Sequence, residues 1–551
     1  MTCREAIYSD NVLDYIVSAY RGTEYIQEQY DPLCITEIDY SRAIIYKQEQ
    51  KINSESIIRF GYGAIPHVYG LMSQEILEAT GVAKIRRQPS LDLYGQDILV
   101  GVVDTGIDFS HEAFINADNT TRIYSIWDQT IQDGQGPEWF EYGKEFTREE
   151  INAALADEEP LSLITTRDDN GHGTFMAGVA AGNEIPDKDF SGVAPLSELV
   201  VVKCKEAKNS YREFYRVRSD APCYQENDIM CGILYVLHTA RKLGKQVAIF
   251  VGMGTNLGNH DGETPLCSMI DYYNMFPGVC IVTCVGNEGT ARHHYYITKD
   301  YEEIDINVEK STQGFVCELW WKTPGSLQFD VVAPGGNTLG ITRAAASVRK
   351  RKIFIVENTW LEVIGGEVQE QTRDQVIMFR FENSKSGVWK IRVYTTEQDV
   401  KYHMWLPIND FLSAETYFSR SDPDITICEP GNSRRAITIS AYNSVNEAFY
   451  FEASRGFTPN GIIKPDVTAP GVDVYGPLPK GGFGRMTGTS VAAAVATGIT
   501  ALFMQEYSGY MISGNSVREL LIRGAERRGE EYPSREWGYG TIDAYESISF
   551  E

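Results

Sequence analysis

The sequence has no unbroken apolar run of the roughly 20 residues that a membrane-spanning helix needs. Its first residues, MTCREAIYSDNVLDYIVSAYRG, lack the charged start, the continuous apolar core and the small-residue cleavage site of a signal peptide. The 10 cysteines among 551 residues form neither a disulfide framework nor zinc-ligand spacing. Cys280 and Cys284, within the apolar run VCIVTCV, are expected to be buried and unreactive. These absences predict a protein that is made in the cytoplasm, under reducing conditions.

Basic residues are scarce. Lysine and arginine number 50 against 76 aspartates and glutamates, so the formal net charge is −26. A chain this acidic repels phosphate backbones and anionic lipid, and we therefore expect neither nucleic acid nor a membrane among its partners. The contents of 43% hydrophobic and 23% charged residues are ordinary for a globular protein. The length exceeds that of one ordinary core, which predicts several domains.

Short apolar runs alternate with helical patterns from about residue 97 to 295. Continuous apolar runs are typical of strands that are covered on both faces, so we expect an α/β fold with a parallel sheet between helix layers. The helical pattern NDIMCGILYVLHTARKLG is predicted to end at Gly244. The predicted strands are Ile98–Asp104, Leu199–Lys203, Val247–Gly252, Val279–Val285 and, after an interruption, Ala436–Ala441.

Two other regions depart from this alternation. The N-terminal region, about 70 residues long, predicts a small α+β module with a helix over Asn11–Tyr20 and strands at ITEID and AIIYKQ. Between about Tyr296 and Asp424 the chain shows aromatic-rich strand patterns without helices, typical of an inserted all-β sandwich. The expected divisions are therefore residues 1–74, 75–295, 296–424 and 425–551, with the second and fourth forming one α/β domain.

Three segments carry residue types that suit nucleophilic catalysis. Asp104 ends a predicted strand in VGVVDTGID, His172 opens a helix in DDNGHGTFMAGVAAG, and Ser490 begins another in MTGTSVAAAVATG. Each alone has a structural explanation, since such residues often cap turns and helices. Together they match a chemical need: a serine hydroxyl requires an imidazole to take its proton, and the imidazole requires a carboxylate. The carboxyl edge of a parallel sheet would bring them together.

The order Asp, His, Ser and these motifs resemble the subtilisins, and the segments SGVAP, VGNEG and KPDVTAPGVDV match the family too. The resemblance implies a serine endopeptidase with Asp104, His172 and Ser490 as its catalytic triad. It also implies an oxyanion hole formed by Asn287 and the Ser490 N–H. Gly252 and Gly254 would form one wall of the substrate site. That wall reads FVGMG, without the serine usual in the family, which leaves the preference at the S1 subsite open.

The chain also resembles, more narrowly, the Csp proteases of clostridial spores, through FGYGAIPHVYGLM, GTNLGNHDG, ELWW, MWLP and YPSREWGYGTIDAYE. This resemblance implies that residues 1–74 are a prodomain that acts as chaperone and inhibitor, removed by self-cleavage between Gln74 and Glu75. It implies that the insert is a jelly roll. The expected partners are this prodomain and a protein substrate, such as a hydrolase precursor activated during spore germination. With such a substrate, the protein would be associated with spores. No metal or other cofactor is expected, because the loop Gly182–Gly192 lacks the usual calcium ligands and no EF-hand pattern occurs.

Two alternatives remain open. Some Csp relatives lack triad residues, so the chain could be a pseudoprotease that binds or regulates a partner, although all three positions and Asn287 are present here. The insert could also bind carbohydrate or a cell surface. Its aromatic residues fit the core of a sandwich better; they are Trp320, Trp321, Trp360, Trp389 and Trp405.

Overall fold

The centre of the molecule is an eight-stranded sheet in a computed structural model that describes residues 2–49, 51–69, 77–88, 90–322, 326–366, 374–395, 401–412, 415–528 and 531–549. The strand order is β24-β23-β11-β10-β5-β8-β6-β7. Neighbouring strands are parallel except for β6 and β7. The strands are β5 (Ile98–Asp104), β6 (Ile123–Asp128), β7 (Lys144–Thr147), β8 (Glu198–Lys203), β10 (Gln246–Val251), β11 (Val279–Cys284), β23 (Ile437–Tyr442) and β24 (Val467–Pro470).

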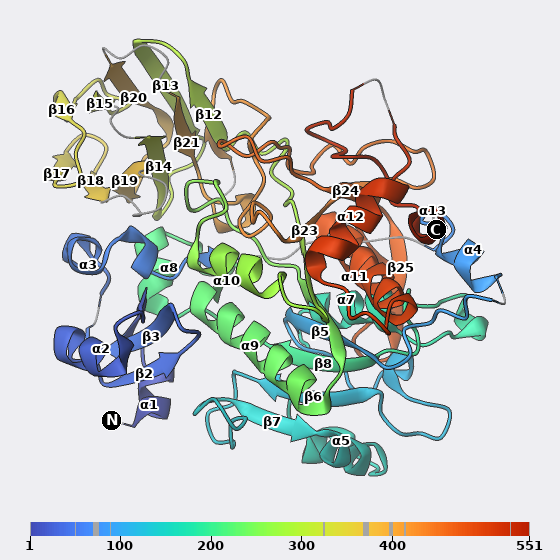
Figure 1. The fold of residues 1–551 in the computed structure, drawn as a ribbon. Helices are drawn as coiled ribbons and strands as arrows, with labels where there is room; N and C mark the ends of the chain where they lie inside the picture. Colours follow the sequence, from blue (N-terminus) through green and yellow to red (C-terminus); the bar gives the residue numbers. More distant parts are fainter. Residues whose placement is uncertain are drawn as a thin grey trace.

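Helices cover both faces of this sheet (Figure 1). The side chains that the strands direct to either face are apolar, as in β5, so both faces must be covered. Val100 and Val102 of β5 share one core with α7 and α11, whereas Leu99 and Val103 share another with α9 and α10. The predicted parallel sheet between helix layers is therefore confirmed. Gly244 ends α9 in a left-handed conformation with φ 63°. These four helices are α7 (His172–Ala181), α9 (Glu226–Leu243), α10 (Pro265–Tyr273) and α11 (Thr489–Glu506).

Shorter elements surround the sheet. The hairpin of β25 and β26 contacts α7, and α12 and α13 pack on each other near α4. The elements are α4 (Val82–Arg86), η2 (Glu112–Phe114), α5 (Arg148–Leu155), α6 (Pro160–Leu163), η3 (Pro186–Lys188), α8 (Asn209–Tyr215), β9 (Tyr224–Gln225), β25 (Val474–Leu478), β26 (Gly482–Met486), α12 (Gly514–Gly524) and α13 (Ala544–Ile548).

The N-terminal residues form a separate antiparallel sheet in the order β1-β3-β2. The helix predicted over Asn11–Tyr20 is wrong, because its centre is strand β1. On one side of β1, Leu13 and Tyr15 belong to one apolar core. On the other side, Ile16 belongs to a different core. A strand buried on both sides shows no alternation, which explains the error. The elements are α1 (Cys3–Tyr8), β1 (Leu13–Ser18), α2 (Gly22–Tyr30), β2 (Cys34–Glu37), β3 (Arg42–Lys47), α3 (Ser54–Phe60), η1 (Tyr62–Ala64) and β4 (Val68–Tyr69).

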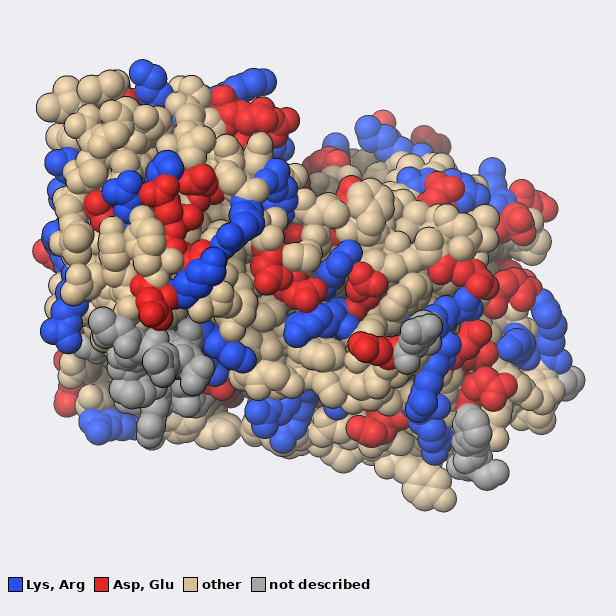
Figure 2. Space-filling view, turned by 90° about the horizontal axis from the view of Figure 1, so that it is seen from above, with Lys and Arg blue, Asp and Glu red and all other residues tan. Residues whose placement is uncertain are grey.

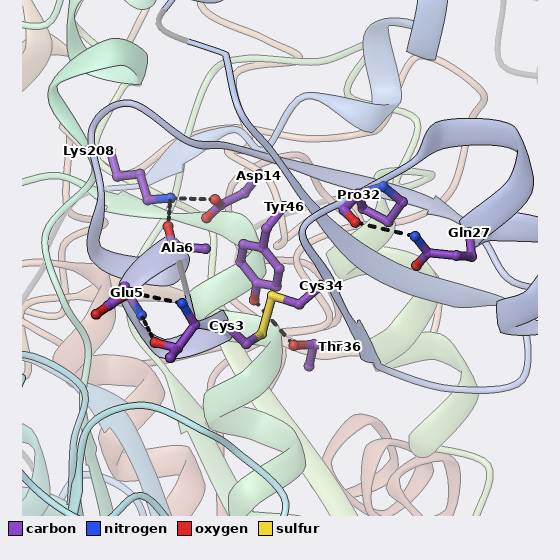
Figure 3. Close-up of a disulfide and its surroundings, with 11 residues drawn as sticks. Cys3, Glu5, Ala6, Asp14, Gln27, Pro32, Cys34, Thr36, Tyr46 and Lys208 are labelled. Atoms are coloured by element: carbon purple, nitrogen blue, oxygen red, sulfur yellow. Dashed lines mark hydrogen bonds and ion pairs between the residues drawn. A yellow bond between two sulfur atoms is a disulfide. The ribbon is translucent and has the colours of Figure 1, made fainter.

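A disulfide joins Cys3 of α1 to Cys34 of β2 (Figure 3). The scattered cysteines are expected to form no disulfide framework, and this pair is an addition that their spacing does not predict. The two residues are 31 positions apart, and only the folding of α1 onto β2 brings their Cα atoms to 5.5 Å. The other eight cysteines are buried thiols. Burial raises the pKa of the Cys284 thiol to about 12, which keeps it protonated and unreactive.

The predicted insert consists of two antiparallel sheets, in the orders β12-β21-β14-β19-β18-β17 and β16-β15-β20-β13-β22, which share one apolar core. They lie at the upper left of Figure 1, beside the α/β part. Trp360 is 49% exposed, but the other four tryptophans of the insert are buried. The elements are β12 (His294–Ile297), β13 (Tyr301–Val308), β14 (Gly314–Lys322), β15 (Leu327–Val332), β16 (Thr342–Arg343), β17 (Arg349–Phe354), β18 (Thr359–Gly366), β19 (Asp374–Glu382), β20 (Gly387–Thr395), β21 (Tyr402–Trp405), η4 (Asn409–Phe411) and β22 (Thr416–Phe418).

Two features of the structure concern the expectation that neither a membrane nor nucleic acid is a partner: the helices and the charges on the surface. Among the described residues, none of the helices combines the length and apolar character that crossing a bilayer requires. Figure 2 shows acidic and basic side chains interspersed over one face of the molecule.

Candidate active site

The three residues predicted to act together do meet at the carboxyl edge of the central sheet. Asp104 is the last residue of β5, His172 is the first residue of α7, and Ser490 is the second residue of α11. The His172 Nδ1 lies 2.8 Å from the Asp104 Oδ1, and the His172 Nε2 lies 3.0 Å from the Ser490 Oγ. All three are buried. The arrangement can therefore pass a proton from the serine hydroxyl to an imidazole that a carboxylate orients.

The start of α11 explains the position of Ser490. Gly488 precedes the helix with φ 150°, a conformation that favours glycine. Ser490 lies in the first turn, where backbone N–H groups have no partner within the helix. Its N–H therefore faces outward from the positive end of the helix dipole, beside its own hydroxyl. This is the environment in which a developing oxyanion is stabilised.

Asn287 lies in the loop that follows β11, next to the start of α11. The Thr489 N–H donates to the Asn287 Oδ1 at 3.2 Å. Because the oxygen of the side-chain amide is held in this way, its NH₂ group points away from Thr489 and stays available as a donor. The loop is fixed again by the Gly286 N–H, which donates to the Thr489 hydroxyl at 3.2 Å. The structure thus joins the predicted oxyanion asparagine directly to the helix of Ser490.

Asp168 also organises the site, although sequence reasoning assigned it no role. Its carboxylate is 3% exposed and accepts hydrogen bonds from the Thr105 hydroxyl, the Gly171 N–H, and both the N–H and the hydroxyl of Thr174. Thr105 follows Asp104, and Gly171 and Thr174 flank His172. One buried carboxylate therefore connects the end of β5 to the first turn of α7. The signal in the sequence was an aspartate four positions before the predicted base, in a glycine-containing turn.

The two glycines predicted as a substrate wall differ in their surroundings. A Cβ atom on Gly252 would lie 3.3 Å from the His172 Cε1, so this residue borders the triad. A Cβ atom on Gly254 would instead lie 3.1 Å from the Cβ of Cys428. The structure brings Gly252 to the site and packs Gly254 against the segment that returns from the insert.

The remaining predictions concern the self-cleavage site and metals. Gln74 and Glu75 lie outside the described residues. Before them, β4 pairs antiparallel with β9, with Tyr69 opposite Tyr224. The Glu226 N–H donates to the His67 carbonyl at 2.9 Å and extends this pairing. In the described part of the chain, no three His, Cys, Asp or Glu side chains are grouped so as to hold a metal ion.

The chain is similar to several known proteins. A model of the subtilase family matches residues 95–360 and 420–540. The serine protease AprX of Bacillus subtilis is 32% identical over 149 residues, which cover 23% of this chain and 33% of that protein. The C5a peptidase of Streptococcus pyogenes is 24% identical over 443 residues, which cover 75% of this chain and 35% of that protein. The chain thus spans about a third of the length of the curated relatives it matches.

Among solved structures, the CspB protease of Clostridium perfringens is similar, with a TM-score of 0.76 and 26% identity. The match covers 85% of this chain and 96% of that one.

Proposed function

The chain belongs to the subtilase family, and from that membership we propose that it is a serine endopeptidase that hydrolyses peptide bonds through an acyl-enzyme. The observation that carries the proposal is the continuous hydrogen-bonded series from Asp104 through His172 to Ser490. Ser490 attacks the peptide carbonyl carbon while His172 takes its proton at Nε2. Asp104 accepts a hydrogen bond from the Nδ1–H, which keeps the required tautomer and stabilises the imidazolium. His172 then gives its proton to the leaving amine, and water hydrolyses the acyl-enzyme.

The oxyanion of the tetrahedral intermediate would be held by two donors. One is the Ser490 N–H at the start of α11, and the other is the NH₂ group of Asn287. The bond from the Thr489 N–H to the Asn287 oxygen supports this role, because it fixes the amide before the substrate arrives. Donors that need no rearrangement during the reaction stabilise the transition state most effectively.

Residues 1–74 would act as a prodomain, with self-cleavage between Gln74 and Glu75. The pairing of β4 with β9 supports this, because β4 precedes the proposed cut in the sequence and pairs with a strand of the α/β part. A substrate segment could add to the edge of the same strand by backbone hydrogen bonds. The buried Lys208 supports a persistent complex, since its ammonium group lies 2.5 Å from the Asp14 Oδ1 (Figure 3). After the cut, the prodomain would remain as a bound partner.

The natural substrate would be another protein, activated by limited proteolysis. The similarity to a clostridial CspB protease supports a germination-type role in which a hydrolase precursor is cut. The insert, residues 296–424, would be a jelly roll, and its shared core supports an independently packed unit.

Labelling tests the proposal directly. A fluorophosphonate probe should modify the purified full chain, and Ser490→Ala should abolish the labelling, because only an activated serine reacts. N-terminal peptide profiling of a matched lysate, treated with the active chain or with Ser490→Ala, would then identify the substrate. If the folded chain fails to react, the alternative of a regulatory pseudoprotease replaces the enzyme.

A further inference from the structure

The side chain next to Asn287 connects three separate parts of the molecule. Glu288 is 4% exposed, and its carboxylate accepts hydrogen bonds from three residues. The Asn256 Nδ2 donates to the Glu288 Oε2 at 3.2 Å, and the His293 Nδ1 lies 2.6 Å from the same oxygen. The backbone N–H of Asn409 donates to the Glu288 Oε1 at 2.9 Å. Both carboxylate oxygens are therefore held by donors that lie outside the oxyanion loop, which we define as residues 285–289.

These donors come from the substrate wall and from the insert. Asn256 follows the wall segment that begins at Gly252. Asn409 is the first residue of η4, between β21 and β22 of the insert. His293 directly precedes β12, and its carbonyl accepts a hydrogen bond of 2.9 Å from the Leu406 N–H, just after β21. Two of the three donors are therefore held by the sandwich.

The backbone of the oxyanion loop is held differently. The Glu288 N–H donates to the Ser454 hydroxyl at 3.0 Å, and the Gly289 N–H donates to the Glu452 carbonyl at 2.9 Å. Both partners belong to the α/β part of the chain. The oxyanion loop is thus fixed through its main chain by the α/β part, and through its one charged side chain by the substrate wall and the insert together.

We propose that the insert positions the oxyanion donor Asn287 through Glu288, so that the sandwich is a working part of the active site. The inference rests on the proposed function and assigns Glu288, His293 and the Asn409 N–H as positioning groups. A buried carboxylate that loses one donor must rearrange to recover it, because an unsatisfied charged group is costly. A displacement of about 1 Å at a catalytic group can reduce turnover by about 100-fold. Loss of one of three donors should therefore lower kcat by about tenfold.

One substitution removes the Asn409 N–H donor. Asn409 begins a 3₁₀ helix, a position that accepts proline, and Ile408 before it has ψ 152°, which proline requires of its predecessor. Asn409→Pro deletes the N–H that reaches Glu288, whereas the matched control Asn409→Ala keeps it. We expect kcat on a peptide substrate to fall about tenfold in Asn409→Pro with KM changed less than about threefold. The loss in Asn409→Ala should be several times smaller.

Repeating the measurement in an Asn287→Ala background separates an effect on the position of Asn287 from general damage to the protein. Asn409→Pro should weaken binding of a peptide boronate, which mimics the transition state, but should have almost no effect on kcat when Asn287 is already alanine. An equal loss in both backgrounds would show general damage and overturn the inference. Unchanged kcat in Asn409→Pro would also overturn it while the triad assignment stands. Full activity in Asn287→Ala would overturn both the oxyanion role and the inference.

Glu288→Gln provides a second route if the proline variant does not fold. Its amide has the shape of the carboxylate but turns an NH₂ group toward one of the donors, so the same loss of kcat is expected. A kcat equal to that of the unmodified chain would contradict the inference.

Discussion

Replacement of Glu318 by glutamine should make the protein more stable, and more so at alkaline pH. Glu318 lies on β14 of the insert and is 1% exposed. The Gly258 N–H and the Trp320 Nε1 donate to its Oε2 at 3.1 and 3.0 Å, and the Tyr62 hydroxyl contacts its Oε1. Glutamine can keep all three contacts, because its oxygen accepts two and its NH₂ group can donate to the Tyr62 hydroxyl.

The expected size follows from the pKa of this carboxyl. Burial raises the pKa of Glu318 from 4.5 to about 7. The folded chain therefore holds the proton over a range in which the unfolded chain has released it. Stability is lost as the pH rises above 4.5, and the loss is complete above pH 7. At about 1.4 kcal/mol per pH unit, the cost is about 1 kcal/mol near pH 5.5 and about 3 kcal/mol near pH 8.5.

The assay is the difference in Tm between Glu318→Gln and the unmodified chain, measured over this pH range. The advantage of the variant should grow by about 2 kcal/mol, or about 2 °C if the chain unfolds as one unit. Glu303→Gln is the matched control in the same insert, because Lys390 and Arg392 lower the pKa of Glu303 and its loss should give no alkaline gain. A difference for Glu318→Gln that stays constant with pH, or grows toward acid, would refute the reasoning.

Three further outcomes are expected. Ser490→Ala and His172→Ala should each lower kcat/KM by several orders of magnitude, and Asp104→Ala somewhat less, because the three act as a unit; comparable turnover in Ser490→Ala would contradict the assignment. The unmodified chain should separate into two fragments under denaturing conditions, cut near Gln74, whereas Ser490→Ala should remain one chain of 61.8 kDa. A cut that persists in Ser490→Ala would indicate another protease. Cys3→Ser should make the N-terminal module easier to proteolyse, because the disulfide closes a separation of 31 residues and is worth about 3–4 kcal/mol; unchanged proteolysis would argue against that contribution.

The triad could be predicted because each of its residues follows a local rule. Asp104 ends a continuously apolar strand, and His172 and Ser490 stand where a glycine-containing turn becomes a helix. Parallel strands then bring these positions to one edge without further information. The family motifs surround the same positions, so the local pattern and the resemblance agree. Asp168 was within one of these motifs, but its role depends on four donors that only the folded chain assembles.

Errors arose where the environment of a segment comes from distant parts of the chain. The apolar run in β1 is buried on two sides and was mistaken for a helix, because its partners belong to two different cores. In the insert, the apolar pattern of KIFIVEN continues beyond the end of β17 at Phe354, although residues 355–358 form a turn. The pairing of Cys3 with Cys34 likewise depends on how α1 packs on β2.

The point of insertion places the sandwich next to the active site, as the proposed role of Glu288 requires. The chain leaves the α/β part directly after the oxyanion loop and enters β12 at His294. It returns beside the substrate wall, where Thr255 and Glu429 exchange two backbone hydrogen bonds of 2.9 Å. Both connections of the insert therefore adjoin loops that shape the site, and Glu288 joins them although Asn409 is 121 residues away. A domain inserted far from these loops, such as between β6 and β7, would have no such contact. At its actual position, a change in how the sandwich packs would reach the oxyanion loop through the two hydrogen bonds that His293 and Asn409 donate to Glu288.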